Sequence, residues 1–189
     1  MYSGVVLAWL LTAGAGGPAV VKDFALADAA GKNHSPAEWQ GKNAVVLLFL
    51  GTECPVSNGY APEYARLVQT FADRGVLIYG VHADPSVSAA DARKHAAEYR
   101  LRFPVLLDPA QVVARQAGVR IVPTAVVLSA EGRVLYRGRI DDRYSADGKR
   151  REEPSSKDLE KAVAAVLDGK SPPAAETKPF GCTLPPPAK

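Results

Sequence analysis

The chain has 189 residues with a formal net charge of +3, and 47% of them are hydrophobic. This length and composition predict one globular domain with a sizeable core. Basic residues gather between Arg133 and Arg151, but acidic residues are mixed with them and few aromatics are interleaved, which argues against nucleic acid as a partner. No phosphate-binding loop, dinucleotide fingerprint, HExxH or GxSxG motif occurs, so nucleotide-dependent, zinc-peptidase and serine-hydrolase functions have no support.

The first residues predict a signal peptide over residues 1–17. An apolar stretch from Val5 to Leu11 is followed by Ala13-Gly14-Ala15, which fits an A-x-A-like cleavage site. The stretch is too short for a membrane span, which needs about 20 apolar residues. The alternatives are an ordinary N-terminal core segment or a misassigned start. A signal peptide places the mature protein in an extracytoplasmic compartment, the periplasm, where disulfides persist.

The predicted domain covers residues 18–169 and begins with a hairpin. Residues 23–26 alternate polar and apolar side chains, as a half-buried strand does, and a turn follows at residues 30–33. Residues 44–50 are all apolar, which predicts a central parallel strand buried on both faces.

Helices and strands then alternate along the chain. A helix predicted over residues 58–72 has its apolar residues at helical spacing, with Glu63, Arg66 and Asp73 on the polar side. A strand is predicted at residues 76–81, followed by a helix that Pro85, Ser86 and Ser88 open and that reaches about Tyr99. A strand at residues 104–107, a helix at 108–118 and a hairpin within 125–136 come next. The last helix is capped by Ser155 and Ser156 and reaches about Leu167. This order predicts an α/β fold, with a mixed sheet covered by helices on both faces.

Cys54 directly follows the central apolar strand and precedes the first long helix. A cysteine at a helix N-terminus is stabilised as a thiolate, which is both a nucleophile and a metal ligand. Pro55 suits the first helical turn. The alternative is an inert core cysteine. Glu53, next to it, is either a proton acceptor for thiol exchange or simply solvated.

Two segments together resemble a known fold. Gly51-Thr52-Glu53-Cys54-Pro55-Val56-Ser57 resembles the thioredoxin CxxC site with Ser57 in the place of the second cysteine, and Ile121-Val122-Pro123-Thr124 resembles the cis-proline segment of that fold. The chain is most similar to bacterial redoxin-type, peroxiredoxin-like (AhpC/TSA-type) proteins with a T-E-C-P-x-S-N segment. The similarity runs from about Val21 to Cys182.

The resemblance implies a thioredoxin-like fold with a central mixed sheet and an N-terminal hairpin extension. The proline-rich composition of residues 170–189 separately predicts an extended C-terminal tail. The resemblance also implies a thiol–disulfide oxidoreductase in which Cys54 is the nucleophile and Val122, Pro123 and Thr124 bind the substrate. Peroxiredoxins have their peroxidatic cysteine at the position of Ser57, so peroxidase activity is not expected here.

Cys182 lies in the proline-rich tail, after the flexible Gly181. We predict that the tail folds back and that Cys182 pairs with Cys54, either as a stable disulfide or as a resolving cysteine that replaces the missing CxxC partner. The alternatives are an unpaired tail thiol and an intermolecular bridge. Ser57, three residues after Cys54, either hydrogen-bonds the thiolate or is an ordinary first-turn residue.

Two other functions stay open. His82 follows the strand at residues 76–81, and together with Cys54 and Cys182 it offers a ligand set suited to Cu(I), although the CxxxC pair of copper-delivery proteins of this fold is absent. His34 and His95 are predicted to be surface residues. The second alternative is a non-catalytic, disulfide-locked binding module. The expected partners are protein or small-molecule thiols and disulfides, with a haem or oxidoreductase protein beside them, and no cofactor other than copper is expected.

Overall fold

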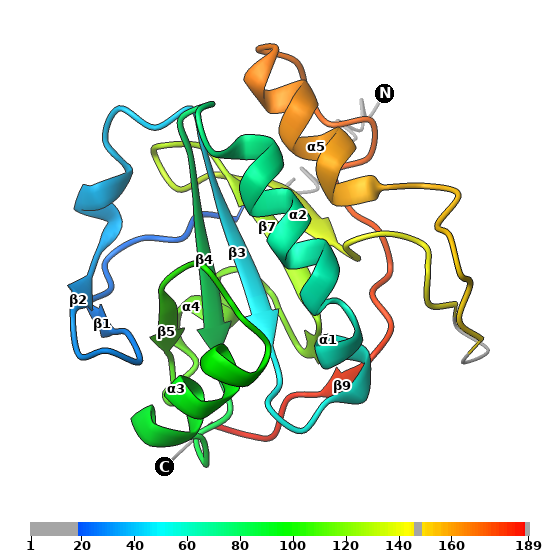
Figure 1. Cartoon of the computed structure of the whole chain (residues 1–189). Helices are drawn as coiled ribbons and strands as arrows, with labels where there is room; N and C mark the ends of the chain where they lie inside the picture. Colours follow the sequence, from blue (N-terminus) through cyan, green and yellow to red (C-terminus); the bar gives the residue numbers. More distant parts are fainter. Residues whose placement is uncertain (1–18, 146–148, 188–189) are drawn as a thin grey trace, which may run out of the picture.

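A computed structural model describes residues 19–145 and 149–187 of the chain (Figure 1). Its centre is a five-stranded sheet in the order β5-β4-β3-β7-β8. The strands are β3 (Ala44–Leu50), β4 (Val76–His82), β5 (Val105–Leu107), β7 (Thr124–Leu128) and β8 (Val134–Gly138). β3, β4 and β5 are parallel to one another, whereas β7 is antiparallel to β3 and to β8. The predicted mixed sheet is confirmed.

The central strand β3 is buried along its whole length because both of its faces are covered. Val45, Leu47 and Phe49 point to one side and pack with α4 (Val112–Gln116) and the N-terminal segment. The alternate residues pack on the other side with α2 (Ala61–Phe71) and α5 (Asp158–Leu167). In Figure 1, α2 and α5 lie together over the same face of the sheet.

The N-terminal hairpin is present but shorter than predicted. It consists of β1 (Leu26–Ala27) and β2 (Asn33–His34), followed by the 3-10 helix η1 (Pro36–Trp39). The predicted strand at residues 23–26 is wrong except for its last residue, because Asp23 has a positive φ of 52°, which a strand does not accommodate.

The first long helix is divided in two. α1 (Pro55–Gly59) ends at Tyr60, and α2 begins at Ala61. Pro62 has no N–H to donate to a carbonyl one turn earlier, so a continuous helix through this point would lose a hydrogen bond. Glu63 is buried rather than on a polar face, and its carboxylate accepts hydrogen bonds from Arg66 at 2.6 and 2.9 Å.

The remaining helices differ from the prediction mainly at their ends. α3 (Ala89–Glu98) has Ser88 at its N-cap, in a capping box with Asp91, so of the three residues expected to open this helix Ser88 is the cap. α4 starts four residues later than expected, because Gln111 has a left-handed φ of 54°. The predicted cap of α5 is wrong: Lys157 occupies the N-cap position, while Ser155 and the N–H of Ser156 bond to Asp142.

The C-terminal arm, defined here as residues 170–187, lies against the domain instead of extending from it. It contains the strand β9 (Cys182–Thr183), which pairs with β6 (Ile121–Val122). In Figure 1 the arm passes close to α1. Within the described residues, no helix is long and apolar enough to cross a membrane. The predicted signal peptide lies outside the described residues.

Candidate redox site

Cys54 is held in the turn between β3 and α1. It occupies the N-cap position of α1, its backbone N–H donates to the carbonyl of Gly51, and it is only 3% exposed. A Cβ atom on Gly51 would lie 3.0 Å from both the Cβ of Cys54 and a methyl group of Val122. A residue without a side chain therefore lets this turn pack against the segment that contains Val122.

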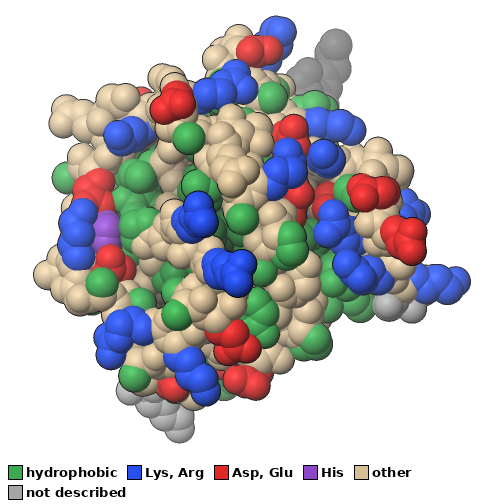
Figure 2. All heavy atoms as spheres, in the orientation of Figure 1, with side chains coloured by type: hydrophobic (Ala, Val, Ile, Leu, Met, Phe, Trp, Pro, Cys, Tyr) green, Lys and Arg blue, Asp and Glu red, His purple; other side chains and the backbone are tan. Residues whose placement is uncertain are grey.

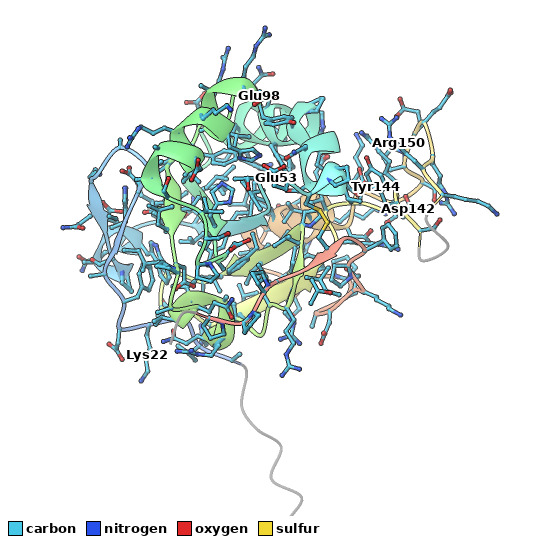
Figure 3. All side chains as sticks on the ribbon, turned by 90° about the horizontal axis from the view of Figure 1, so that it is seen from below. Lys22, Glu53, Glu98, Asp142, Tyr144 and Arg150 are labelled. Carbon is cyan, nitrogen blue, oxygen red and sulfur yellow. A yellow bond between two sulfur atoms is a disulfide. The ribbon has the colours of Figure 1, made fainter. Side chains whose placement is uncertain are left out.

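Cys54 and Cys182 form a disulfide, with their Cα atoms 6.1 Å apart. The preferred pairing of the two cysteines is confirmed, and the unpaired alternatives do not describe this structure. The bridge joins residues 128 positions apart in the sequence. Figure 3 shows the yellow disulfide between the start of α1 and the arm, with Glu53 labelled in the same region.

Backbone pairing places Cys182 over Cys54. In the antiparallel β6–β9 pair, Val122 is opposite Cys182 and Ile121 is opposite Thr183. The N–H of Leu184 donates to the carbonyl of Arg120 at 2.9 Å. A Cβ atom on Gly181 would collide with the carbonyl group of Val122, so only glycine allows this close approach.

Side chains fasten the arm on both sides of the bridge. Gln111 donates to the carbonyls of Ala83 and Pro185, at 3.0 and 2.7 Å. On the other side, Thr177 contacts the hydroxyl of Tyr136 at 2.6 Å and accepts from the N–H of Arg139 at 3.1 Å. Sequence reasoning missed these contacts. Gln111 and its partner Pro185, like Thr177 and its partner Tyr136, are far apart in the sequence, and no local pattern marks them as partners.

The Val122–Pro123 peptide bond is cis, as the resemblance implied. The carbonyl oxygen of Val122 lies 3.4 Å from the sulfur of Cys54. The hydroxyl of Thr124 donates to the carbonyl of Ile121 at 2.7 Å. The three residues expected to bind substrate therefore lie beside the bridge, but β9 of the same chain covers the edge that contains Val122.

Ser57 shapes the turn that holds Cys54. Its side chain is 1% exposed, and its hydroxyl accepts the N–H of Gly51 at 3.2 Å. Of the two interpretations made from the sequence, the described contacts give no hydrogen bond from Ser57 to Cys54, and Ser57 lies in the first turn of α1. Its hydroxyl instead closes the loop between β3 and α1.

The histidines do not form a metal site in this arrangement. His82 is buried, its Nδ1 lies 3.1 Å from the carbonyl of Leu50, and burial lowers its pKa to about 4, so it is neutral at pH 7. Both sulfurs of the predicted copper set are bonded to each other. Among the described residues, no group of three or more His, Cys, Asp or Glu side chains is placed to hold a metal ion.

His34 and His95 were wrongly predicted to lie on the surface, since both are buried. The ring of His95 packs against His82, with centroids 5.0 Å apart, and its Nε2 lies 2.9 Å from the side-chain oxygen of Asn58. Burial lowers the pKa of His95. His95 thus links α3 to α1.

A polar hollow of about 850 Å³ lies on the outer side of the Cys54 loop. Thr52, Glu53 and Pro55 line one wall, and Lys94 and Glu98 of α3 line the opposite wall. Glu53 is exposed, in agreement with the solvated interpretation of its side chain. The hollow leaves the loop before Cys54 open to solvent while Cys54 itself stays buried.

A mixed sheet, a cysteine at the turn after its central strand, and a cis-proline beside that cysteine together define a thioredoxin-like protein of the redoxin type. The family model described as the AhpC/TSA family matches residues 19–137, and the chain belongs to that family.

Known proteins are similar to this chain over most of the domain. The thiol-disulfide oxidoreductase ResA of Halalkalibacterium halodurans is 31% identical over 114 residues, which are 60% of this chain. The chain spans 62% of the length of that curated relative and 63% of the protein of the same name from Geobacillus thermodenitrificans.

Two solved structures share the fold. A hypothetical protein from Sinorhizobium meliloti 1021 matches with a TM-score of 0.80 and 26% identity, over 91% of this chain and 95% of that chain. A candidate thiol:disulfide interchange protein DsbE from Chlorobium tepidum matches with a TM-score of 0.62 and 23% identity, over 79% of this chain and 96% of that chain.

Proposed function

We propose that this protein is a thiol–disulfide oxidoreductase whose redox centre is the Cys54–Cys182 pair. The observation that supports this most directly is the disulfide itself, which joins a core cysteine to a cysteine on the arm, directly beside Val122 and Pro123. Similarity to relatives named thiol-disulfide oxidoreductase agrees with the proposal.

The proposed reaction is thiol–disulfide exchange. Two electrons and two protons from a substrate dithiol, or from two thiols, convert the bridge into the Cys54 and Cys182 thiols, while the substrate becomes a disulfide. The reverse reaction reduces a substrate disulfide. Ser57 positions the Cys54 loop, and Val122, Pro123 and Thr124 form the surface beside the bridge. We propose Cys54, Cys182, Ser57 and Pro123 as the working residues of the site.

The proposed setting is extracytoplasmic, because disulfides form and persist in an oxidising compartment. The signal peptide over residues 1–17, the domain over residues 18–169, the arm that follows it and a periplasmic location belong to this proposal. The proposed partners are protein or small-molecule thiols and disulfides, and a haem protein or a second oxidoreductase is a candidate among them.

Redox titration followed by intact mass tests the function. We expect the folded protein to gain two alkyl groups only after reduction, with a midpoint that shifts with the ratio of reduced to oxidised glutathione. Cys54→Ser and Cys182→Ser should each reduce the rate of disulfide exchange at least about 100-fold, because each removes half of the redox pair. Ser171→Ala, an exposed change in the same arm, is the matched control. Full turnover by either cysteine variant would contradict the proposal.

One observation favours a second candidate function, the disulfide-locked binding module. The arm is fastened by backbone pairing and by Gln111 and Thr177, independently of the bridge. A bridge that remains closed in the folded protein under a large excess of glutathione, but opens in urea, would favour that function over an oxidoreductase.

A further inference from the structure

The two cysteines of the bridge differ in burial. Cys54 is 3% exposed and belongs to the apolar cluster that contains Val119 and Val122. Cys182 is half-buried and packs against the outside of that cluster. An external thiolate must reach the sulfur that it attacks, so access decides which sulfur of a disulfide reacts.

We infer that external thiols exchange with this protein through Cys182, while Cys54 reacts only with Cys182. The inference rests on the proposed function and assigns different roles to the two cysteines of that site. Cys54 remains a nucleophile, as the sequence predicted, but its electrophile is a disulfide held on the arm of its own chain.

The first step is a single displacement at sulfur. The thiolate of an external thiol attacks the sulfur of Cys182, a bond forms between these two sulfurs, and the Cys54–Cys182 bond breaks. The electron pair of the broken bond stays on Cys54 as a thiolate. A second external thiolate then attacks the external sulfur of the mixed disulfide, which releases the oxidised small-molecule disulfide and leaves Cys182 as a thiolate that takes up a proton.

Contacts that do not involve sulfur keep the mixed disulfide in place. Val122 and Cys182 remain paired through their backbones, and Leu184 remains bonded to Arg120. Gln111 holds the carbonyl of Pro185. Cys182 therefore holds its adduct directly beside the Cys54 thiolate. The Cys54 thiolate either attacks Cys182 and re-forms the bridge, or remains free while a second external thiol removes the adduct.

The docked arm also restricts how a partner approaches. β9 occupies the backbone edge of Ile121 and Val122, so a partner chain has no access to that edge while the arm is in place. A partner reaches the bridge from the outer side of the arm. This geometry suits a small thiol or a cysteine on an exposed segment of a protein.

Peptide mapping of a trapped adduct tests the inference on the full, oxidised chain. The protein is mixed with reduced glutathione, quenched after short intervals with acid and N-ethylmaleimide, and digested with trypsin. The two cysteines fall into different peptides, residues 43–66 and the peptide that begins at residue 171. We expect glutathione on Cys182 and the maleimide on Cys54, with at least about a tenfold excess of this pattern over the reverse pattern at early times.

Unfolded protein provides the control. In urea both sulfurs are accessible, and both adducts should appear at comparable levels, which proves that the assay detects glutathione on Cys54. Cys54→Ser is instead charged with oxidised glutathione, which exchanges with the Cys182 thiol and releases one reduced glutathione. After removal of free glutathione, this adduct on Cys182 should be long-lived, because the Cys54 thiolate that would displace it is absent. Glutathione mainly on Cys54, or equally on both cysteines of the folded protein, would overturn the inference and leave the proposed function standing. A bridge that never opens in the folded protein would overturn both.

Discussion

At the scale of single residues, a buried ionic cluster ties the N-terminal hairpin to the sheet. The ring nitrogens of His34 lie 2.7 Å from Glu38 and 3.0 Å from Asp28. The hydroxyl of Tyr79, in β4, donates to Glu38 at 2.6 Å. This hydrogen bond is the largest cause that lowers the pKa of Glu38 to about 2, and His34 and Lys32 act in the same direction against the effect of burial.

We predict that Tyr79→Phe lowers the free energy of unfolding by about 1–2 kcal/mol at pH 7, because the Glu38 carboxylate loses a donor. The folded-state pKa of Glu38 lies below its ordinary value of 4.5, so this stabilisation is fully present above about pH 4.5 and is lost as the pH falls towards 2. Urea unfolding of both proteins across this range measures the effect, with Tyr99→Phe as the control. A difference that is independent of pH would contradict the prediction.

At the scale of elements, the short β6–β9 pair decides whether the bridge can form. Gly181 precedes β9, and any side chain there would collide with the carbonyl of Val122. The strand itself is only two residues long, so it has few backbone bonds with which to compensate for a collision. The register of β9 places Cys182, and not a neighbour, opposite Val122.

We therefore predict that Gly181→Ala shifts the bridge towards the open dithiol by about tenfold in a glutathione buffer, because it displaces the arm that presents Cys182. Alkylation followed by intact mass measures the fraction of closed bridge. Thr183→Ala, an exposed change in the same strand, is the matched control and should leave the equilibrium unchanged. An unchanged equilibrium in Gly181→Ala would show that the arm docks without this close contact.

At the scale of the whole molecule, the bridge closes residues 54–182 into a loop, which contains every element of the sheet except β3. A covalent link between residues 128 positions apart restricts the unfolded chain strongly. The domain has charges of both signs distributed over the face shown in Figure 2, with apolar atoms between them.

Opening the bridge should lower the free energy of unfolding by up to about 4–5 kcal/mol in the chain-entropy model. Urea unfolding with and without dithiothreitol measures this change, and Cys182→Ser without reductant should match the reduced wild-type protein. Equal stability of the oxidised and reduced forms would show that the arm contributes nothing through the bridge.

Local signals in the sequence determined much of the fold. A continuous apolar run predicts the buried strand β3, Pro85, Ser86 and Ser88 predict the start of α3, and the segment Gly51–Ser57 predicts the redoxin-type site by its resemblance to that family. Each of these depends on neighbours in the sequence, through side-chain periodicity, capping chemistry or a short motif. The boundaries of the shorter helices were less accurate, because single residues such as Pro62 and Gln111 interrupted patterns that otherwise continue.

Only the tertiary structure decided how distant residues meet. The sequence left open whether Cys182 pairs with Cys54, stays an unpaired thiol or forms an intermolecular bridge, and the strand that delivers it has no apolar pattern of its own. His34 and Glu63 resemble surface residues in the sequence, yet the fold buries both and leaves each of them a charged partner close by in the chain, Asp28 for His34 and Arg66 for Glu63. The physical reason is common to all three residues. A sequence shows which bonds a side chain is able to form, whereas packing determines which partner comes within bonding distance and how deeply each residue is buried.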